Sequence, residues 1–311
     1  MKETKLLILL LIIGFIGGLI FTQPVFAQKV GVSISPLTFE LSANPGDDIS
    51  NKLKVYNPTD SIITIKMEVE DFKTVGETGQ VIVTPEEETT YSLKKWVSIN
   101  PIEFTLKPGE SEFVSFDILV PENAEPGGKY GSILASPVAI MGEEATGTSV
   151  FSKVGALLLL TVAGEVKEGL IIKEFFAPSF LETGPVPFTI RLENTGTVHL
   201  RPRGFVTISN WRGKKVTDIA FPQNNIIPGS IRKIEASWDN KWLFGKYTAI
   251  LVGSYGISNI PFTATMTFWV FPWKMVLGIF LALLLILIFF YKTRRRWRLA
   301  LKILIKGEKS F

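Results

Sequence analysis

The side chains that most often carry catalysis are scarce in this chain. Its 311 residues include one histidine, His199, and no cysteine. A serine triad needs one histidine as its base, but His199 falls on a predicted strand beside Arg201 and Arg203, and no Gly-x-Ser-x-Gly turn is present. The absence of cysteine removes thiol catalysis and thiolate-bound zinc. We therefore predict that the chain is not an enzyme.

Carboxylate groups are the other residues that could do chemistry. They could bind calcium or, paired across a cleft, cleave glycans. None has the spacing of a calcium-binding loop, so we interpret them as solvated loop charge and predict no metal or cofactor. The groups are Asp47 and Asp48; Glu68, Glu70 and Asp71; and Glu86, Glu87 and Glu88.

The first 27 residues have the pattern of a secretory signal peptide. Lys2 and Lys5 precede an apolar run at 6–20, and the segment ends in the small residue Ala27. A basic start, an apolar centre and small residues before the cleavage point define such a signal. We expect cleavage between Ala27 and Gln28, which makes 1–27 a signal peptide. The alternative is an uncleaved membrane anchor.

A second apolar block predicts a transmembrane helix at 273–291. Residues 275–291 carry no charge, which suits a bilayer core. Aromatic residues mark a membrane interface and a basic cluster marks the cytoplasmic side, so we predict a cytoplasmic tail at 292–311 and extracytoplasmic N-terminal domains. The aromatic residues are Trp269 and Trp273, and the basic cluster is Lys292, Arg294, Arg295, Arg296 and Arg298.

The charge distribution bears on possible partners. The isoelectric point near 9.0 could suggest nucleic acid binding. However, acidic residues outnumber basic ones over 29–165, and the basic excess is concentrated in the tail, where anionic lipid attracts it. We predict membrane lipid as a partner and exclude nucleic acid.

One phrase occurs twice, as GGKYGSILAS at 127–136 and as FGKYTAILVGS at 244–254. Each copy follows a Pro-Gly pair and a run of alternating apolar residues, and an asparagine, Asn57 or Asn194, ends an earlier run. Runs with an apolar residue at every second position, separated by Pro-Gly pairs, are typical of half-buried strands joined by turns. This order of strands and turns indicates an immunoglobulin-like sandwich.

We therefore predict a mainly β chain, with two tandem immunoglobulin-like β-sandwiches at 28–165 and 166–271 and one C-terminal transmembrane α-helix. Tyr130 and Tyr247 stand where a tyrosine corner would tie a hydroxyl to upstream backbone. The first copy is longer between Asn57 and its Pro-Gly pair, and we expect those extra residues on the surface, where binding often occurs. The near absence of a linker predicts a stiff two-domain rod.

The amino-acid sequence of the first half is specific enough to show a resemblance to a family. The segments VGVSISPLTFEL and FTLKPGESEFVSFDILVPENAEPGGKYGSILAS, together with the signal peptide, second sandwich, helix and basic tail, resemble the WxL-interacting proteins of bacterial surfaces. The resemblance implies a peptidoglycan-binding first domain over 28–165 and a host- or partner-binding second domain over 166–271. The shared segments define turns and strands, so they imply no ligand-binding residue.

The function implied by this resemblance is a membrane-anchored cell-surface adhesion protein that attaches to peptidoglycan and to secreted surface proteins. The alternative is a membrane-tethered chaperone or assembly component for exported proteins. An enzyme acting on wall glycans is a third, weaker hypothesis.

Overall fold

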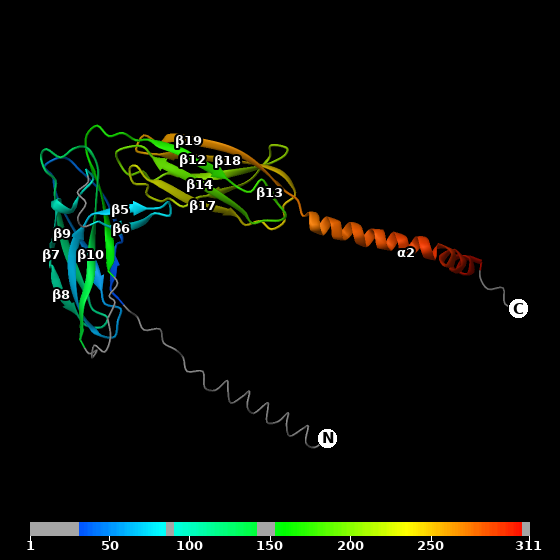
Figure 1. Cartoon of the computed structure of the whole chain (residues 1–311), viewed down its shortest axis with the longest axis horizontal. Helices are drawn as coiled ribbons and strands as arrows, with labels where there is room; N and C mark the ends of the chain where they lie inside the picture. The colour runs from blue at the N-terminus through cyan, green and yellow to red at the C-terminus, as the bar shows by residue number, and fades with distance from the viewer. Residues whose placement is uncertain (1–30, 85–89, 142–152, 307–311) are drawn as a thin grey trace, which may run out of the picture.

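The computed structural model describes residues 31–84, 90–141 and 153–306. Strands dominate the described residues and form two sandwiches, and the one long helix among them, α2 (Trp273–Lys306), follows the last strand (Figure 1). The predicted mainly β, immunoglobulin-like fold with a C-terminal apolar helix is confirmed. The predicted signal peptide, with Ala27 and Gln28, lies outside the described residues.

Sandwich 1 is the N-terminal pair of sheets. One sheet has the strand order β1-β3-β9-β7 and the other β2-β11-β10-β4-β8. The strands are β1 (Ser33–Ser35), β2 (Thr38–Ala43), β3 (Asp48–Tyr56), β4 (Ile62–Glu70), β7 (Val97–Asn100), β8 (Glu103–Leu106), β9 (Ser111–Leu119), β10 (Gly127–Met141) and β11 (Val154–Val162).

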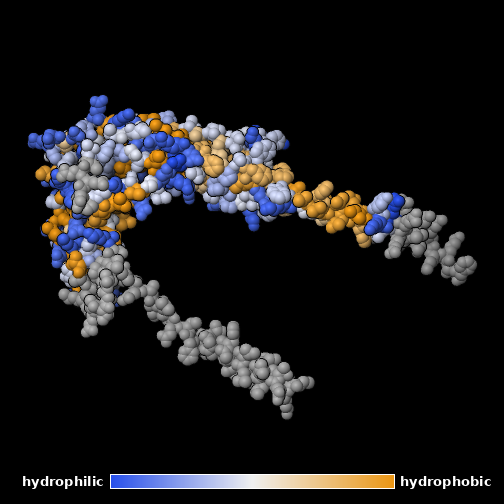
Figure 2. Space-filling view, viewed as in Figure 1, coloured by the Kyte–Doolittle hydropathy of each residue, from blue (hydrophilic) through white to orange (hydrophobic). Residues whose placement is uncertain are grey.

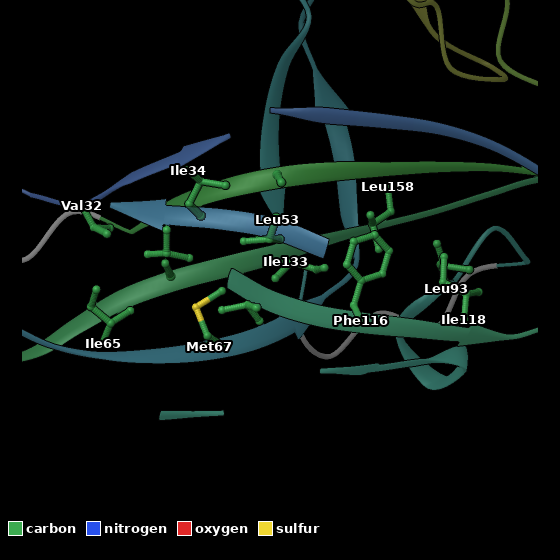
Figure 3. Close-up of a cluster of buried hydrophobic side chains, with 14 of the residues drawn as sticks. Val32, Ile34, Leu53, Ile65, Met67, Leu93, Phe116, Ile118, Ile133 and Leu158 are labelled. Carbon is green, nitrogen blue, oxygen red and sulfur yellow. The ribbon is translucent and has the colours of Figure 1, made fainter. Parts of the chain in front are cut away.

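The core of sandwich 1 lies between these two sheets. Alternate residues of β9, such as Phe116 and Ile118, point inward and are fully buried. Figure 3 shows Phe116 close to Leu158 and Ile133 of the opposite sheet. Each such side chain contributes about 1.5–3 kcal/mol by its burial, so the alternation seen in the sequence is what holds the sheets together.

Strand β11 is buried on both of its faces. Leu158 and Leu160 belong to the core of sandwich 1. Leu159 points the other way and packs with Phe72 and Tyr130 in a separate cluster. The leucine-rich run at 157–160 is therefore part of a strand with buried side chains on both faces, and its second face is covered by residues from outside the core of sandwich 1.

Sandwich 2 has the same plan. Its sheets have the strand orders β12-β14-β17 and β13-β19-β18-β15-β16, and a second core lies between them. The strands are β12 (Leu170–Phe176), β13 (Phe180–Leu181), β14 (Val186–Asn194), β15 (Arg203–Asn210), β16 (Lys215–Ala220), β17 (Ile231–Trp238), β18 (Gly245–Tyr255) and β19 (Ile260–Val270).

A buried asparagine closes the end of β3 in sandwich 1. The Asn57 side-chain amide donates to the carbonyl of Ser61 at 2.8 Å and to that of Leu106 at 3.1 Å. Its backbone carbonyl accepts from Gly109 N at 3.0 Å. Gly109 has φ 73°, a conformation that favours glycine. One side chain thus joins two turns that are about 50 residues apart in the chain.

Asn194 does the same at the end of β14 in sandwich 2. Its amide donates to the carbonyls of Val198 at 2.8 Å and Ile226 at 2.7 Å, and its backbone carbonyl accepts from Gly229 N at 2.8 Å. Both asparagines have no exposed surface. The repeated sequence order therefore corresponds to a repeated hydrogen-bond arrangement.

The two tyrosines of the repeated phrase differ in their roles. The Tyr247 hydroxyl donates to the carbonyl of Phe244, three residues upstream, at 3.3 Å, which confirms the predicted tyrosine corner. The Tyr130 hydroxyl has no such bond to upstream backbone, because its ring faces His199 of the connection between β14 and β15, at a centroid distance of 5.9 Å. The prediction for Tyr130 is therefore wrong, and so is the placement of His199 on a strand.

The sandwiches meet at a marked angle rather than end to end (Figure 1). The connection between them is held to sandwich 2, since Thr195 N donates to the carbonyl of Gly169 at 2.9 Å and Thr197 N to that of Lys167 at 2.8 Å. The lack of a free linker was predicted correctly. The predicted stiff two-domain rod is not the observed shape, because the two sandwiches lie at an angle and make further contacts across it.

We predict that Asn57→Ala lowers the free energy of unfolding by about 2–4 kcal/mol, because the buried carbonyl of Leu106 and the partly buried carbonyl of Ser61 lose their donors. Chemical denaturation of the full chain in detergent, monitored by near-UV circular dichroism, measures this. The matched control is Asn51→Ala, at a half-exposed position in the same strand β3, with an expected change within about 0.5 kcal/mol. Equal losses for the two variants would contradict the role assigned to Asn57.

Candidate binding site between the sandwiches

A hairpin from the extra segment of sandwich 1 reaches sandwich 2. It consists of β5 (Phe72–Val75) and β6 (Gln80–Val83), and Figure 1 shows it extending across the angle between the sandwiches. Two runs of strand-forming residues flank the turn sequence GETG, in which Gly76 and Gly79 have positive φ. A side chain at Gly79 would also collide with the Arg232 guanidinium, so glycine permits this close approach.

The tip of the hairpin is bound by an ion pair. The Glu77 carboxylate accepts two hydrogen bonds from Arg191 of β14, at 2.6 Å from Nε and 2.5 Å from Nη2. Arg191 also contacts Glu174 of β12 at 3.2 Å. The backbone carbonyl of Glu77 accepts from Lys233 N of edge strand β17 at 2.7 Å. The Arg191 guanidinium lowers the pKa of Glu77 below its usual value.

A second polar contact lies on the other side of the junction. Glu40 of β2 accepts from Asn225 Nδ2 at 2.7 Å and contacts Arg201 Nη1 at 3.3 Å. Gly128 N of β10 donates to the carbonyl of Thr197 at 2.8 Å. The sandwiches are therefore joined at several separated points, and the space between these points forms a cleft.

This cleft, which we call the inter-sandwich cleft, contains a cavity on each side of the hairpin. Cavity A holds about 540 Å³ and cavity B about 400 Å³, and Phe72 and Thr74 of β5 line both. In Figure 2, hydrophilic residues gather where the two sandwiches meet. Other residues that line cavity A are Thr38, Glu40, Leu157, Leu159, Arg201, Gln223, Asn225 and Arg232; others that line cavity B are Lys73, Tyr91, Tyr130, Ile227 and Ile231.

Buried polar atoms without a protein partner are concentrated here. Among the described residues, four of the five such atoms belong to the cleft or its wall: Tyr130 Oη, His199 Nδ1, Asn225 Oδ1 and Arg232 Nε. The His199 backbone lies near the Tyr130 hydroxyl without making a full hydrogen bond. Because buried polar groups are nearly always paired in proteins, these atoms mark the junction as a region whose polar groups the protein itself does not fully satisfy.

Burial also affects the ionisation of these side chains. It raises the pKa of Tyr130 and lowers the pKa of His199, although Glu40 partly opposes the second shift. Burial likewise lowers the pKa of Arg232. At neutral pH the junction therefore contains a neutral phenol and a neutral imidazole, both buried, and the guanidinium of Arg232, which lines cavity A. A guanidinium binds polar or anionic groups by hydrogen bonding.

Strand β2 offers an open edge beside cavity A. It is the terminal strand of its sheet in the described part of the chain. The carbonyls of Leu37 and Ala43 accept from β11 and from the residue just after it. The backbone N–H and C=O groups of successive residues alternate between the two edges of a strand. Because Leu37 and Ala43 face β11, Thr38, Glu40 and Ser42 direct their backbone N–H and C=O groups away from it. An extended chain could pair with these groups.

Of the carboxylates that the sequence offered as candidates, Asp71 and Asp47 form hydrogen bonds within the fold. Asp71 is buried and accepts from Ser92 Oγ and from the backbone N–H groups of Leu93 and Lys94. Asp47 accepts from Asn44 N at 2.6 Å in a turn. Residues 86–88 lie outside the described residues. No group of three metal-ligating side chains occurs within the described ranges.

The residues predicted to mark the membrane lie along the end of the chain. Trp269 is on β19, half exposed, and Trp273 begins α2. Residues Trp273–Arg294 form a segment long and apolar enough to cross a membrane, and Figure 2 shows this segment as a hydrophobic column that ends in hydrophilic residues. The helix continues to Lys306 and includes the predicted cluster Lys292, Arg294, Arg295, Arg296 and Arg298.

Sequence reasoning missed the residues that form the cleft. Glu77, Arg191 and Arg232 lie on elements that are far apart in the chain, and no pattern in the sequence pairs them. The GETG turn between two strand-like runs is a hairpin signal. It does not indicate which surface the hairpin tip contacts.

No known family model matches the chain, and no curated protein sequence matches it. Solved structures resemble it in fold. The class 5 fimbriae chaperone CfaA is 18% identical with a TM-score of 0.40, covering 76% of this chain and 98% of that chain. The E. coli chaperone DraB is 14% identical with a TM-score of 0.33, covering 78% and 98%. A structure of the Salmonella enterica SafA pilin with the SafB chaperone is 12% identical with a TM-score of 0.37, covering 78% and 99%.

These comparisons correct the main functional expectation from the sequence. The proteins that resemble this chain are described as fimbrial chaperones and a chaperone–pilin complex, and none of the three is described as a peptidoglycan-binding adhesin. The adhesion function is therefore not retained. The resemblance to WxL-interacting proteins and the division at residues 165 and 166 stay predictions.

Protonation of Glu77 should release the hairpin tip. The pKa of Glu77 is lowered in the folded chain, so the ion pair contributes above the usual carboxylate pKa and is lost as pH falls through the lowered value. We expect the protection of the Lys233 amide against hydrogen exchange to fall over that range, after correction for the intrinsic rate. Glu77→Gln should give the low value at every pH. Protection that is independent of pH and of this substitution would contradict the assignment.

Proposed function

We propose that this chain is a membrane-tethered chaperone or assembly component that holds extended segments of exported proteins in the inter-sandwich cleft. The observation that carries the proposal is the position of the open β2 edge beside cavity A, whose wall contains unpartnered buried polar atoms. A strand edge and a polar cavity together suit a polypeptide, which offers backbone hydrogen bonds along its length.

The binding mode follows from the outward backbone groups of Thr38, Glu40 and Ser42. An extended segment that adds to β2 forms main-chain hydrogen bonds that do not depend on its sequence. Where side chains of that segment face cavity A, apolar ones contact Leu157 and Leu159, and polar or acidic ones contact the Arg232 guanidinium. Binding of this kind suits chains that have not yet completed their own sheets.

The function requires no catalysis. The cleft provides the Arg232 guanidinium as a hydrogen-bonding group, and we assign it no chemical step. The partners are extended segments of secreted surface proteins, bound before those proteins are assembled.

The membrane tether in this proposal is α2. In this proposal the segment Trp273–Arg294, which is long and apolar enough to cross a membrane, spans the bilayer, and the basic residues at its C-terminal end and beyond stay on the cytoplasmic side. The sandwiches then face the outside, where exported chains emerge. A tethered cleft meets those chains at a high effective concentration.

Site-specific crosslinking in producing cells tests the proposal. A photoreactive benzoylphenylalanine at Gln223, which is exposed and lines cavity A, should crosslink to proteins that carry secretory signals. The same residue at Ile257, which is 87% exposed and lies outside the cleft, should not. Identification of the products by mass spectrometry gives the readout.

A matched pair of substitutions at Ser42 tests the open edge. Ser42→Pro removes an outward N–H without changing the bonds to β11, so crosslinking from Gln223 should fall several-fold. Ser42→Ala keeps that N–H and should crosslink as the unsubstituted chain does. Crosslinks that are equal from Gln223 and Ile257, or unaffected by Ser42→Pro, would contradict the proposal.

A further inference from the structure

The end of sandwich 2 from which α2 leaves contains several turns. Strand β18 begins there, since Gly245 pairs with Val270, the last residue of β19. Strand β15 ends there, since its last residue Asn210 pairs with Tyr247. The turns at 211–214 and 239–244 therefore lie at the same end as the start of α2.

Large aromatic side chains on these turns are strongly exposed. Trp211, Trp242 and Phe244 have 66%, 66% and 67% of their surface accessible. Phe244 lies beside the exit of α2, because its ring is 5.4 Å from that of Phe271, and Trp211 is near, since a Cβ at Gly245 would lie 3.8 Å from it. Trp242 is in the same turn as Phe244. A soluble surface rarely gathers such side chains without a partner.

Basic side chains accompany these aromatic rings. The Arg212 guanidinium lies 4.5 Å from the Trp211 ring centre, and the Lys274 ammonium lies 5.7 Å from that of Trp273. Lys274 also pairs with Glu182 at 2.6 Å, which joins the first turn of α2 to sandwich 2. Tryptophan with lysine or arginine is the combination that prefers the region between lipid headgroups and acyl chains.

The connection to α2 leaves sandwich 2 little freedom to move away from a membrane. Only residues 271 and 272 separate β19 from α2. Phe271 N donates to the carbonyl of Leu181, and Trp273 N donates to that of Phe271 at 2.8 Å. If α2 spans a bilayer from Trp273, the exposed rings of the neighbouring turns lie at the depth of the headgroups.

We propose that Trp211, Trp242 and Phe244 form an aromatic collar that inserts into the outer-leaflet interface around α2. The collar seats sandwich 2 on the lipid surface and fixes the direction of the inter-sandwich cleft relative to the membrane. The proposal rests on the membrane tether of the proposed function. It does not depend on what the cleft binds.

Spin labelling of the full chain in phospholipid vesicles tests the collar. The chain has no cysteine, so one introduced thiol carries the only label. A nitroxide at Trp242→Cys or Phe244→Cys should show a several-fold higher ratio of oxygen to water-soluble nickel accessibility than one at Ile257→Cys. Ile257 is in the turn at the opposite end of β18 and β19, which makes it the matched exposed control.

A label at Leu284→Cys, within α2, tests the membrane tether separately from the aromatic collar. Lipid accessibility at both 284 and 242 supports the collar. Lipid accessibility at 284 with water accessibility at both 242 and 244 overturns the collar and leaves the tether intact. Water accessibility at 284 overturns the tether itself, and the collar with it. Circular dichroism of each variant checks that the sandwiches remain folded.

Discussion

The arrangement of this molecule depends on how the β5–β6 hairpin binds sandwich 2. Glu77 at the hairpin tip accepts two side-chain hydrogen bonds from Arg191, and its backbone carbonyl accepts a third from Lys233 N. Two-point contact of a carboxylate with a guanidinium fixes direction as well as distance. Because the tip is fixed, the sandwiches keep an angle at which cavities A and B remain between them.

The cleft, the tether and the collar then form one system. The cleft places the open edge of β2 beside buried polar atoms, and α2 is long and apolar enough to serve as the proposed membrane tether. The collar, as proposed, fixes the whole assembly against lipid. A protein that receives exported chains at a membrane benefits from such rigidity, because a preformed site loses less conformational entropy when it binds.

The sequence predicted those features that depend on local patterns. Alternation with period two predicted the strands, and the repeated Asn, Pro-Gly and Gly-x-Tyr signals predicted the immunoglobulin-like order of strands and turns, because each signal reflects a local backbone requirement. The cleft could not be predicted in this way. Glu77 and Arg191 are 114 residues apart and their pairing depends on the angle between the sandwiches. Tyr130 fails as a tyrosine corner for the same reason, since sandwich 2 supplies its neighbour His199.

The distance between the sandwiches tests the central claim most directly. Nitroxides at Lys54→Cys on sandwich 1 and Thr263→Cys on sandwich 2, both exposed positions, report this distance in the full chain by pulsed electron resonance. We predict one narrow distance distribution that broadens when Glu77→Ala is added. A broad distribution in the chain with Glu77 intact, or a narrow one that Glu77→Ala leaves unchanged, would contradict the claim that the hairpin fixes the two sandwiches.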